Sequence, residues 1–230
     1  MTRIVKKAKE RRKEILQKAQ ELFFKQGYNH TSVNMVIEAL SISKGAFYHY
    51  FKSKEELLDC LAEEFTQKII NLIEKITNNP NLNAIEKLNR MYKESGNYKV
   101  ENIDFIMTMT EALYNSKNLL LRYKFDHKTV NDVLPFMTAI FQQGQDEGVF
   151  NIDNPEATAR IVLLLGVNIG EHNAKLLLQL KNNPEKIDEM HEHFMVYQKS
   201  VERILGAPQG SFQAINKKFF ETFRDKLVNS

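Results

Sequence analysis

Residues 31–57 read TSVNMVIEALSISKGAFYHYFKSKEEL, and this stretch decides the fold. Its first part spaces four apolar residues as one face of a helix does: Val33, Val36, Ile37 and Leu40. After a break at 41–43, Ser43 is a good N-cap for a second short helix that ends near Tyr50. Two short helices joined by a three-residue break predict a helix-turn-helix, whose second helix can enter the major groove of DNA.

Helices are also expected on both sides of this pair. Residues 9–26 carry an apolar stripe at helical spacing and end at Gly27, which suits the position just after a helix. Ser53 and Glu56 have the form of a capping box, which predicts a longer helix from there to about Ile76.

The rest of the chain keeps a helical pattern. Helices are expected at 82–97, 101–115, 118–147, 154–180, 184–205 and 209–227. Pro135 should kink or divide one of them, whereas Pro184 and Pro208 should mark helix starts. Asp153 and Glu156 offer a further capping box. The predicted fold class is therefore all-α.

Charge divides the chain into two parts. Residues 1–54 hold 12 Lys and Arg against 4 Asp and Glu, a net of +8, so the remaining residues carry −5 of the total +3. A basic module suggests a polyanion such as DNA, although a solvated basic helix has the same composition. Charge alone therefore indicates one basic N-terminal module joined to a mildly acidic body.

Side chains of the second short helix fit this interpretation. Phe47 and Phe51, with Ile42, can pack against the preceding helices, which leaves an outward set: Lys44, Ala46, Tyr48 and His49. Tyr48 and Tyr50 carry hydroxyls suited to phosphates or base edges. We expect the basic tail to add affinity through phosphate contacts, from Arg3, Lys6, Lys7, Lys9, Arg11, Arg12 and Lys13.

The run from Ser43 to Leu57 matches S-x-G-x-x-Y-x-Y-F-x-x-K-E-x-L and resembles the N-terminal signature of the TetR family of regulators. The close resemblance covers about residues 10–60. It implies a three-helix DNA-binding head at 1–53, joined by a connecting helix to a larger ligand-binding and dimerisation body at 54–230. It also implies phosphate contacts from Thr31, Ser32, Lys44, Tyr48, Tyr50 and Lys54, and we count Ser43, the predicted cap of the second short helix, with these DNA-binding residues. It places Lys44, Gly45, Ala46 and His49 nearest the bases and makes Phe47 and Phe51 structural.

Three residues depart from the family pattern. Ile37 and Leu40 stand where small residues are common, and Ser41 stands where glycine is common. Serine tolerates a left-handed turn less well than glycine does. The short helix also has no Arg, which excludes a bidentate arginine–guanine contact from it.

The body is expected to bind a small, largely apolar effector. Flexible and aromatic apolar side chains recur between 82 and 180, which is typical of plain core and also of a permissive pocket. The candidate pocket residues are Tyr92, Phe105, Met109, Tyr123, His127, Met137, Phe141, Asn168, Glu171 and His172.

A homodimer is expected through the helices at 154–180 and 184–205. The stretch 161–167 is apolar on nearly all sides, as in a dimer seam or a central buried helix. The function predicted is a repressor that binds a near-palindromic operator as a dimer and releases it on binding the effector. The alternative is a helical adaptor whose head binds any polyanion.

The sequence lacks the motifs that are typical of enzymes and of metal-binding proteins. We find no catalytic residue set, no phosphate loop, no His-Glu-x-x-His motif and no Glu-x-x-His pairs, so no enzyme, cofactor or metal site is predicted. His191 and His193 are two apart and point in different directions on a helix. With the single cysteine Cys60, a basic N-terminus and no long apolar run, we expect a cytoplasmic protein without membrane contact.

Overall fold

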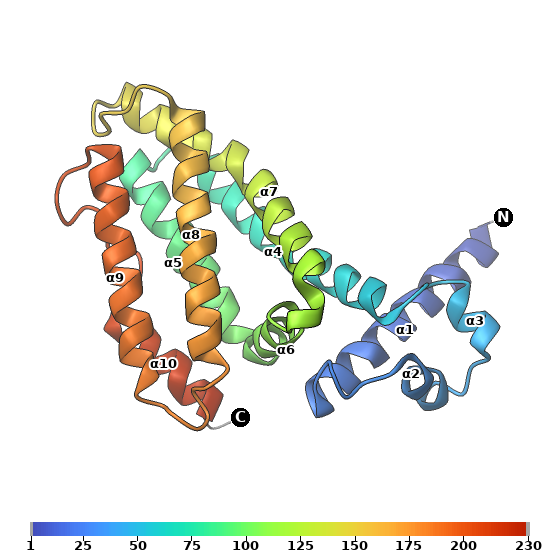
Figure 1. Ribbon diagram of the computed structural model, residues 1–230. Coiled ribbons are helices and arrows are strands. Elements are labelled where there is room, and N and C mark those ends of the chain that lie inside the picture. The colour runs from blue at the N-terminus through green and yellow to red at the C-terminus, as the bar shows by residue number, and fades with distance from the viewer. Residues whose placement is uncertain (1, 229–230) are drawn as a thin grey trace. The chain divides into compact units, whose positions relative to one another are not determined.

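A computed structural model describes residues 2–228, except for the side chains of 2–7, Lys117 and Val228. Within that range every regular element is a helix, which confirms the all-α prediction. The α-helices are α1 (Thr2–Gln26), α2 (Val33–Ala39), α3 (Lys44–Tyr48), α4 (Lys54–Thr77), α5 (Ala84–Glu101), α6 (Ile103–Leu113), α7 (Leu119–Asp146), α8 (Pro155–Leu177), α9 (Lys186–Leu205) and α10 (Lys217–Val228) (Figure 1). A short 3-10 helix, η1 (Ser116–Asn118), precedes α7.

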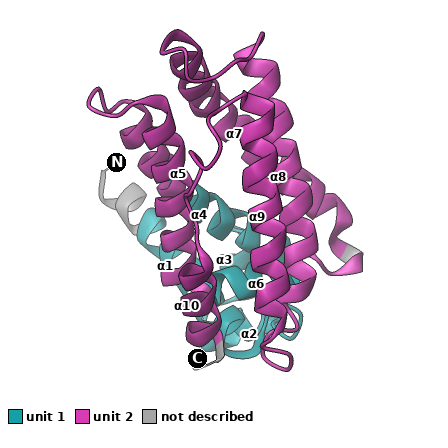
Figure 2. Ribbon diagram, turned by 90° about the vertical axis from the view of Figure 1, so that its left-hand side faces the viewer, with its two compact units in different colours: residues 1–67, 104–112 teal, residues 68–103, 113–230 magenta. Residues whose placement is uncertain are grey.

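The chain forms two compact units (Figure 2). Residues 1–67 with 104–112 make the head unit, and residues 68–103 with 113–230 make the body unit. Helix α4 begins in the head unit and ends in the body unit, and most of α6 belongs to the head unit. The predicted functional boundary after Ser53 lies at the start of α4 and stays a prediction.

The head unit is built around the stripe that the sequence indicates on α1. Ile15, Ala19 and Phe23 are fully buried, as are Phe47 and Phe51 from the helix-turn-helix. Burying a large apolar side chain contributes about 1.5–3 kcal/mol, so these rings hold the short helix α3 in place. Helix α6 adds Phe105, whose ring stacks on Phe65 of α4 at 4.4 Å between centroids.

The turns of the head unit follow the predicted capping residues. Gly27 adopts a left-handed φ of +84°, and its N–H donates to the Phe23 carbonyl. Ser53 Oγ accepts from the Glu56 N–H at 3.2 Å, which confirms the cap of α4. The Glu56 carboxylate reaches back to the N–H of Lys52 at 2.6 Å, one residue before the predicted partner.

The body unit packs α5, α7, α8 and α9 around one apolar core. Met137, Ile140 and Phe141 of α7 are fully buried in it, as is Val162 of α8. Helix α7 runs unbroken past Pro135, so of the two predicted effects of this proline the division is excluded and the kink stays a prediction. Among the described helices, none combines the length and the apolar content that a membrane crossing requires.

One predicted cap and one predicted helix start in the body unit are wrong. Asn154 caps α8, since its side chain accepts from the Ala157 N–H at 3.0 Å, and Asp153 lies outside the helix. The last helix begins at Lys217 and not after Pro208.

Side chains from other helices explain the late start of α10. Asn89 of α5 accepts from the Gln213 N–H and donates to the Ser211 carbonyl, both at 2.7 Å. Glu202 of α9 accepts from the Phe212 N–H at 2.9 Å. These bonds satisfy backbone groups that a helix would otherwise pair, so the segment stays irregular.

Candidate nucleic-acid interface

Helix α3 presents one buried and one exposed side. Phe47 is fully buried, and its ring contacts the ring of Phe51 at 6.1 Å between centroids. On the other side Lys44, Gly45 and His49 are exposed, and Tyr48 is 54% exposed. The buried phenylalanines therefore fix the direction in which the exposed residues point.

The turn before α3 is a Schellman motif that ends α2. The Ser41 N–H donates to the Glu38 carbonyl at 3.0 Å, and the Ile42 N–H donates to the Ile37 carbonyl at 3.2 Å. Ser41 has a left-handed φ of 51°, which is the conformation that favours glycine at this position. Ser43 then caps α3, because its Oγ accepts from the Ala46 N–H at 3.1 Å.

Gly45 lies in open space. A Cβ atom added there would meet no side chain closer than the Ser43 Oγ at 4.0 Å. Its φ also lies outside the left-handed region. Nothing in the described part of the head unit therefore requires a glycine at this position, so a requirement for one would have to come from a binding partner.

Thr31 and Lys54 face the inside of the head unit, although the family resemblance implies that they contact phosphates. Thr31 is 2% exposed, and its hydroxyl donates to the Gly27 carbonyl at 2.9 Å. The Lys54 ammonium donates to the Tyr28 carbonyl at 2.8 Å and lies 4.1 Å from the centre of the Tyr28 ring. Burial lowers the pKa of Lys54. Both side chains tie the start of α2 and α4 to the end of α1.

The remaining predicted contact residues are accessible to different degrees. Ser32 is exposed, and its Oγ accepts from the Met35 N–H at 3.3 Å as the cap of α2. Ala46 and Tyr50 are half-buried. Of the predicted basic tail, Lys9, Arg11, Arg12 and Lys13 are exposed, whereas the side chains of Arg3, Lys6 and Lys7 lie outside the described residues.

Lys52 is an exposed cation that the sequence motifs do not single out. It lies directly before α4, between the buried Phe51 and the cap Ser53. No family motif marks Lys52, but its position beside the positive start of a helix could have identified it as a candidate phosphate contact.

The predicted effector residues do not form one site. Met137 and Phe141 belong to the core of the body unit and Tyr92 packs against it, whereas Phe105 and Met109 are buried in the head unit. The other five predicted residues lie on the outer faces of α7 and α8. Glu171 is partly exposed, and the four remaining residues are exposed: Tyr123, His127, Asn168 and His172.

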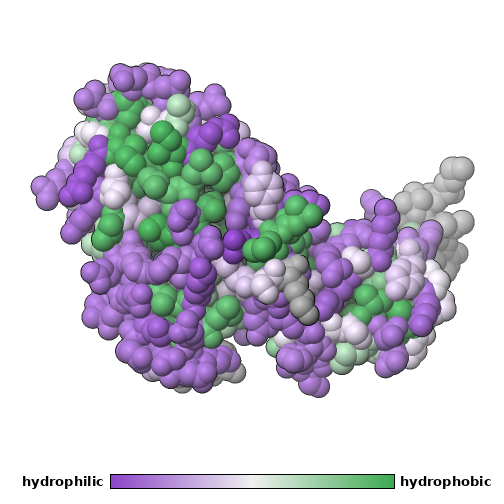
Figure 3. Space-filling view, viewed as in Figure 1, coloured by the Kyte–Doolittle hydropathy of each residue, from purple (hydrophilic) through white to green (hydrophobic). Residues whose placement is uncertain are grey.

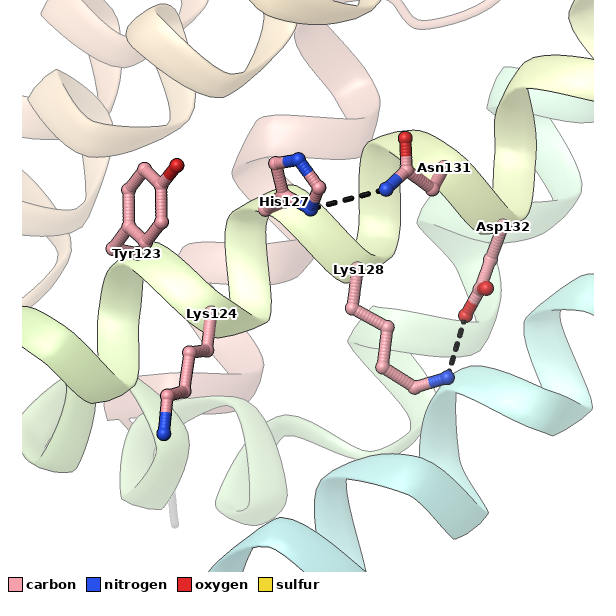
Figure 4. A pocket seen from close by; sticks show the side chains of 6 residues that line it. All are labelled: Tyr123, Lys124, His127, Lys128, Asn131 and Asp132. Atoms are coloured by element: carbon pink, nitrogen blue, oxygen red, sulfur yellow. Dashed lines mark hydrogen bonds and ion pairs between the residues drawn. The ribbon is translucent and has the colours of Figure 1, made fainter.

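A shallow hollow of about 330 Å³ runs along α7 (Figure 4). Tyr123, His127 and Asn131 line it from successive turns, and Lys124, Lys128 and Asp132 line it beside them. His127 and Asn131 are joined at 3.0 Å, and Lys128 pairs with Asp132 at 3.0 Å. All six residues come from one face of one helix, so this chain alone does not enclose a ligand there.

Inside the body unit, the half-buried Tyr92 and the buried Tyr197 form a polar pair. Their hydroxyl oxygens lie 2.6 Å apart, and Tyr197 also donates to the Val162 carbonyl at 3.2 Å, so Tyr92 is the donor to Tyr197. Burial raises the pKa of Tyr92 to about 12 and raises that of Tyr197.

Known proteins match the sequence of this chain mainly in the head. Residues 15–61 match the family model for bacterial regulatory proteins of the tetR family. The chain is 45% identical over 65 residues to YuxN, an uncharacterized HTH-type transcriptional regulator of Bacillus subtilis, which is 28% of this chain and 22% of YuxN. It is 30% identical over 95 residues to the HTH-type transcriptional repressor KstR2 of Mycobacterium tuberculosis, which is 41% of this chain and 47% of KstR2. The chain thus spans less than half the length of these two relatives.

Solved structures match over most of the fold. SmeT, the repressor of the Stenotrophomonas maltophilia multidrug efflux pump SmeDEF, superposes with a TM-score of 0.64 at 19% identity, over 90% of this chain and 95% of SmeT. SmeT has also been solved in complex with triclosan. Residues 15–61 thus match the tetR family of bacterial regulatory proteins, and the chain as a whole shares the fold of SmeT.

Proposed function

We propose that this protein is a ligand-responsive transcriptional repressor that binds a near-palindromic operator as a homodimer and releases it on binding a small, largely apolar effector. The observation that carries the proposal is the outward set Lys44, Gly45, Tyr48 and His49 on α3, held by buried phenylalanines within the segment that matches the family model. Access to chromosomal DNA requires a cytoplasmic location, which is part of the same proposal.

In this proposal α3 lies in the major groove and the exposed cations around it meet phosphates. Ser32, Ser43, Tyr48 and Tyr50 offer hydroxyls, and Lys44 offers a charge, whereas Gly45, Ala46 and His49 lie nearest the bases. We add Lys52 to the phosphate set. We assign Thr31 and Lys54 a supporting role, since both are engaged inside the head unit.

Gly45→Ala provides a sharp test of this arrangement. Alanine meets no neighbour in the free protein and is a better helix former by about 1 kcal/mol, so the variant should fold at least as stably. Bound DNA would lie against the added methyl group, so operator affinity should fall at least tenfold. Unchanged operator affinity in the folded variant would argue against a close approach at this position.

Selection of bound sequences from a random duplex library, at about 150 mM salt, tests the function as a whole. Recovery of one near-palindromic motif, bound roughly 10³-fold more tightly than random DNA, is expected. Binding without a motif that disappears as salt rises would favour the adaptor alternative. Deleting residues 1–9 should also reduce the slope of log K against log salt, by about 0.9 for each phosphate that the tail no longer neutralises.

The dimer is proposed to form through α8 and α9. Ile161, Leu164 and Leu165 of α8 are 39–53% exposed, and Val196 of α9 is 57% exposed. Figure 3 shows apolar side chains gathered over the part of α8 nearest its start. A second copy of the chain could remove this apolar surface from water on both copies at once, because an isologous interface uses the same patch twice.

Sedimentation of charge variants tests that interface. Leu164→Glu should convert the dimer to a monomer, because it places two carboxylates across the seam. Leu120→Glu on α7, at a position 67% exposed, is the matched apolar-to-acid control and should remain dimeric. A dimer that persists in Leu164→Glu would exclude this seam.

The effector is proposed to bind in the body unit. The fold shared with SmeT, which has been solved with triclosan, supports a small-molecule site there. Two sets of predicted residues compete: the core set around Tyr92, Met137 and Phe141, and the surface set around Tyr123 and His127. Once an effector that releases the operator is found, Tyr92→Phe and His127→Ala should separate the sets, since only one of them should weaken release.

A further inference from the structure

Three potential metal ligands from two helices of the body unit converge near the turn that joins α8 to α9. His172 lies on α8, and Glu189 and His193 lie one turn apart on α9. One ligand atom from each residue lies within 4.8 Å of the others. We propose that these three side chains bind a divalent transition-metal ion of the zinc type and that the bound ion clamps α8 to α9.

The distances leave room for an ion between the side chains. Nε2 of His172 is 3.9 Å from Oε1 of Glu189, and Nε2 of His193 is 4.0 Å from the same oxygen. Both separations are too long for a hydrogen bond. An ion bound tetrahedrally at about 2.0–2.1 Å separates its ligand atoms by about 3.4 Å. Small rotations of His172 and Glu189, which are 59% and 45% exposed, would bring the atoms to that separation.

A fourth side chain fixes His193 in the form that binds a metal. Its Nδ1 lies 3.0 Å from Oδ1 of Asn173 on α8. An amide oxygen can only accept a hydrogen bond, so in the neutral imidazole Nδ1 carries the proton and Nε2 keeps a free lone pair toward Glu189. Metal-binding histidines are commonly oriented in this way by a partner on the other ring nitrogen.

The kind of ligand indicates the kind of ion. Two imidazole nitrogens and one carboxylate suit zinc and its neighbours nickel and copper, whereas magnesium and calcium prefer oxygen ligands. The ring centroids of His172 and His193 are 4.6 Å apart with their planes at 71°, so the two rings are not stacked face to face. Because the side chains of His172 and Glu189 are exposed, a fourth position is open to water.

The sequence alone predicts no metal site because the ligand set is not continuous in the chain. Glu189 and His193 have the i,i+4 spacing that places two ligands on one helix face, but they form only half of a usable site. The third ligand comes from α8, and only the packing of α8 on α9 brings it near. By residue type and position, His172 is instead a candidate for the effector pocket.

Calorimetric titration with Zn²⁺ tests the proposal on the full chain without a polyhistidine tag, after dialysis against a chelator and then against chelator-free buffer. One Zn²⁺ per chain is expected, with no competition from Mg²⁺. His172→Ala and His193→Ala should each lower the affinity at least tenfold. His30→Ala, an exposed histidine of the head unit, should leave it unchanged.

Asn173→Ala separates a positioning role from a ligand role. It removes no ligand, yet it should lower Zn²⁺ affinity about 10- to 100-fold because it releases the orientation of His193. A saturating amount of Zn²⁺ should also raise the melting temperature of the unmodified chain by several degrees, and this rise should be lost in His172→Ala.

Several outcomes would overturn the proposal. One is the absence of saturable binding of one ion per chain, and another is full affinity in both histidine variants. A third is one ion shared by two chains, seen as zinc-dependent association in sedimentation. If His193→Ala fails to fold, judged by circular dichroism, the exposed His172 still gives a variant that decides the question. None of these measurements involves DNA, so they are independent of the proposed function.

Discussion

Replacing Ser41 by glycine should stabilise the helix-turn-helix. Ser41 is the described non-glycine residue with a positive φ, 51°, and its side chain is exposed, so its removal breaks no packing. A left-handed conformation costs an ordinary L-residue about 1–2 kcal/mol. Glycine removes this cost, but it also increases the conformational entropy of the unfolded chain. That increase lowers the stability of the folded protein by about 0.4–1 kcal/mol. The expected net gain is about 0.5–1 kcal/mol.

Hydrogen exchange of the backbone amides between 33 and 51 measures this gain locally. If these amides exchange through opening of the head unit, a gain of about 0.5–1 kcal/mol slows them by about two- to fivefold. The effect should be largest for the amides that close the motif, such as that of Ile42, which donates to the Ile37 carbonyl.

Two variants control for other effects of the substitution. Ser41→Ala removes the hydroxyl but keeps Cβ, so it should leave exchange almost unchanged. Asn34→Gly adds a glycine at an exposed position inside α2, where it should speed exchange because glycine disfavours helix. Equal exchange rates in Ser41→Gly and Ser41→Ala would refute the argument from backbone conformation.

Other predictions concern the body unit. Gly144→Ala should destabilise it by about 1–3 kcal/mol in thermal denaturation, because the new Cβ would lie 2.0 Å from the buried Phe150 ring. The control Gly170→Ala has open space around it and should be neutral or stabilising. Asn154→Ala should cost about 1 kcal/mol and Asp153→Ala little, because only Asn154 caps α8; equal losses would contradict the observed cap. Stability should fall as pH rises from about 10 toward 12, because Tyr92, packed against the core, keeps its proton to about pH 12 while the unfolded chain releases it near 10. The Tyr92→Phe/Tyr197→Phe double variant should show a flatter alkaline profile in denaturant titrations, and an unchanged profile would exclude these two groups as its cause.

The head could be predicted from the sequence because its signals are local. The caps Ser43 and Ser53, the turn residue Gly27 and the buried rings of Phe47 and Phe51 each act within a few residues of their position, and the structure confirms all of them. The inward direction of Thr31 and Lys54 could not be predicted, because it depends on carbonyl groups at the end of α1 that only the folded head brings within reach.

The body was harder to predict because its decisive contacts join residues far apart in the chain. The start of α10 depends on Asn89 and Glu202, which no local pattern around Pro208 reveals. The pairing of Tyr92 with Tyr197 and the meeting of His172 with His193 arise in the same way. Candidate pocket residues chosen by type alone are therefore scattered between core, surface and head.

Cys60 gives this chain a natural position for a spectroscopic label. It is the only cysteine in a sequence without tryptophan, so a thiol-reactive fluorophore would attach at one place with no competing signal. Burial raises the pKa of the thiol although the Arg12 guanidinium, 3.0 Å from Sγ, acts in the opposite direction, so Cys60 should react slowly at neutral pH while α1 packs on α4. The rate of alkylation would then report how often the first part of α1 separates from α4. Local opening of the head unit could therefore be measured in the protein with its native sequence.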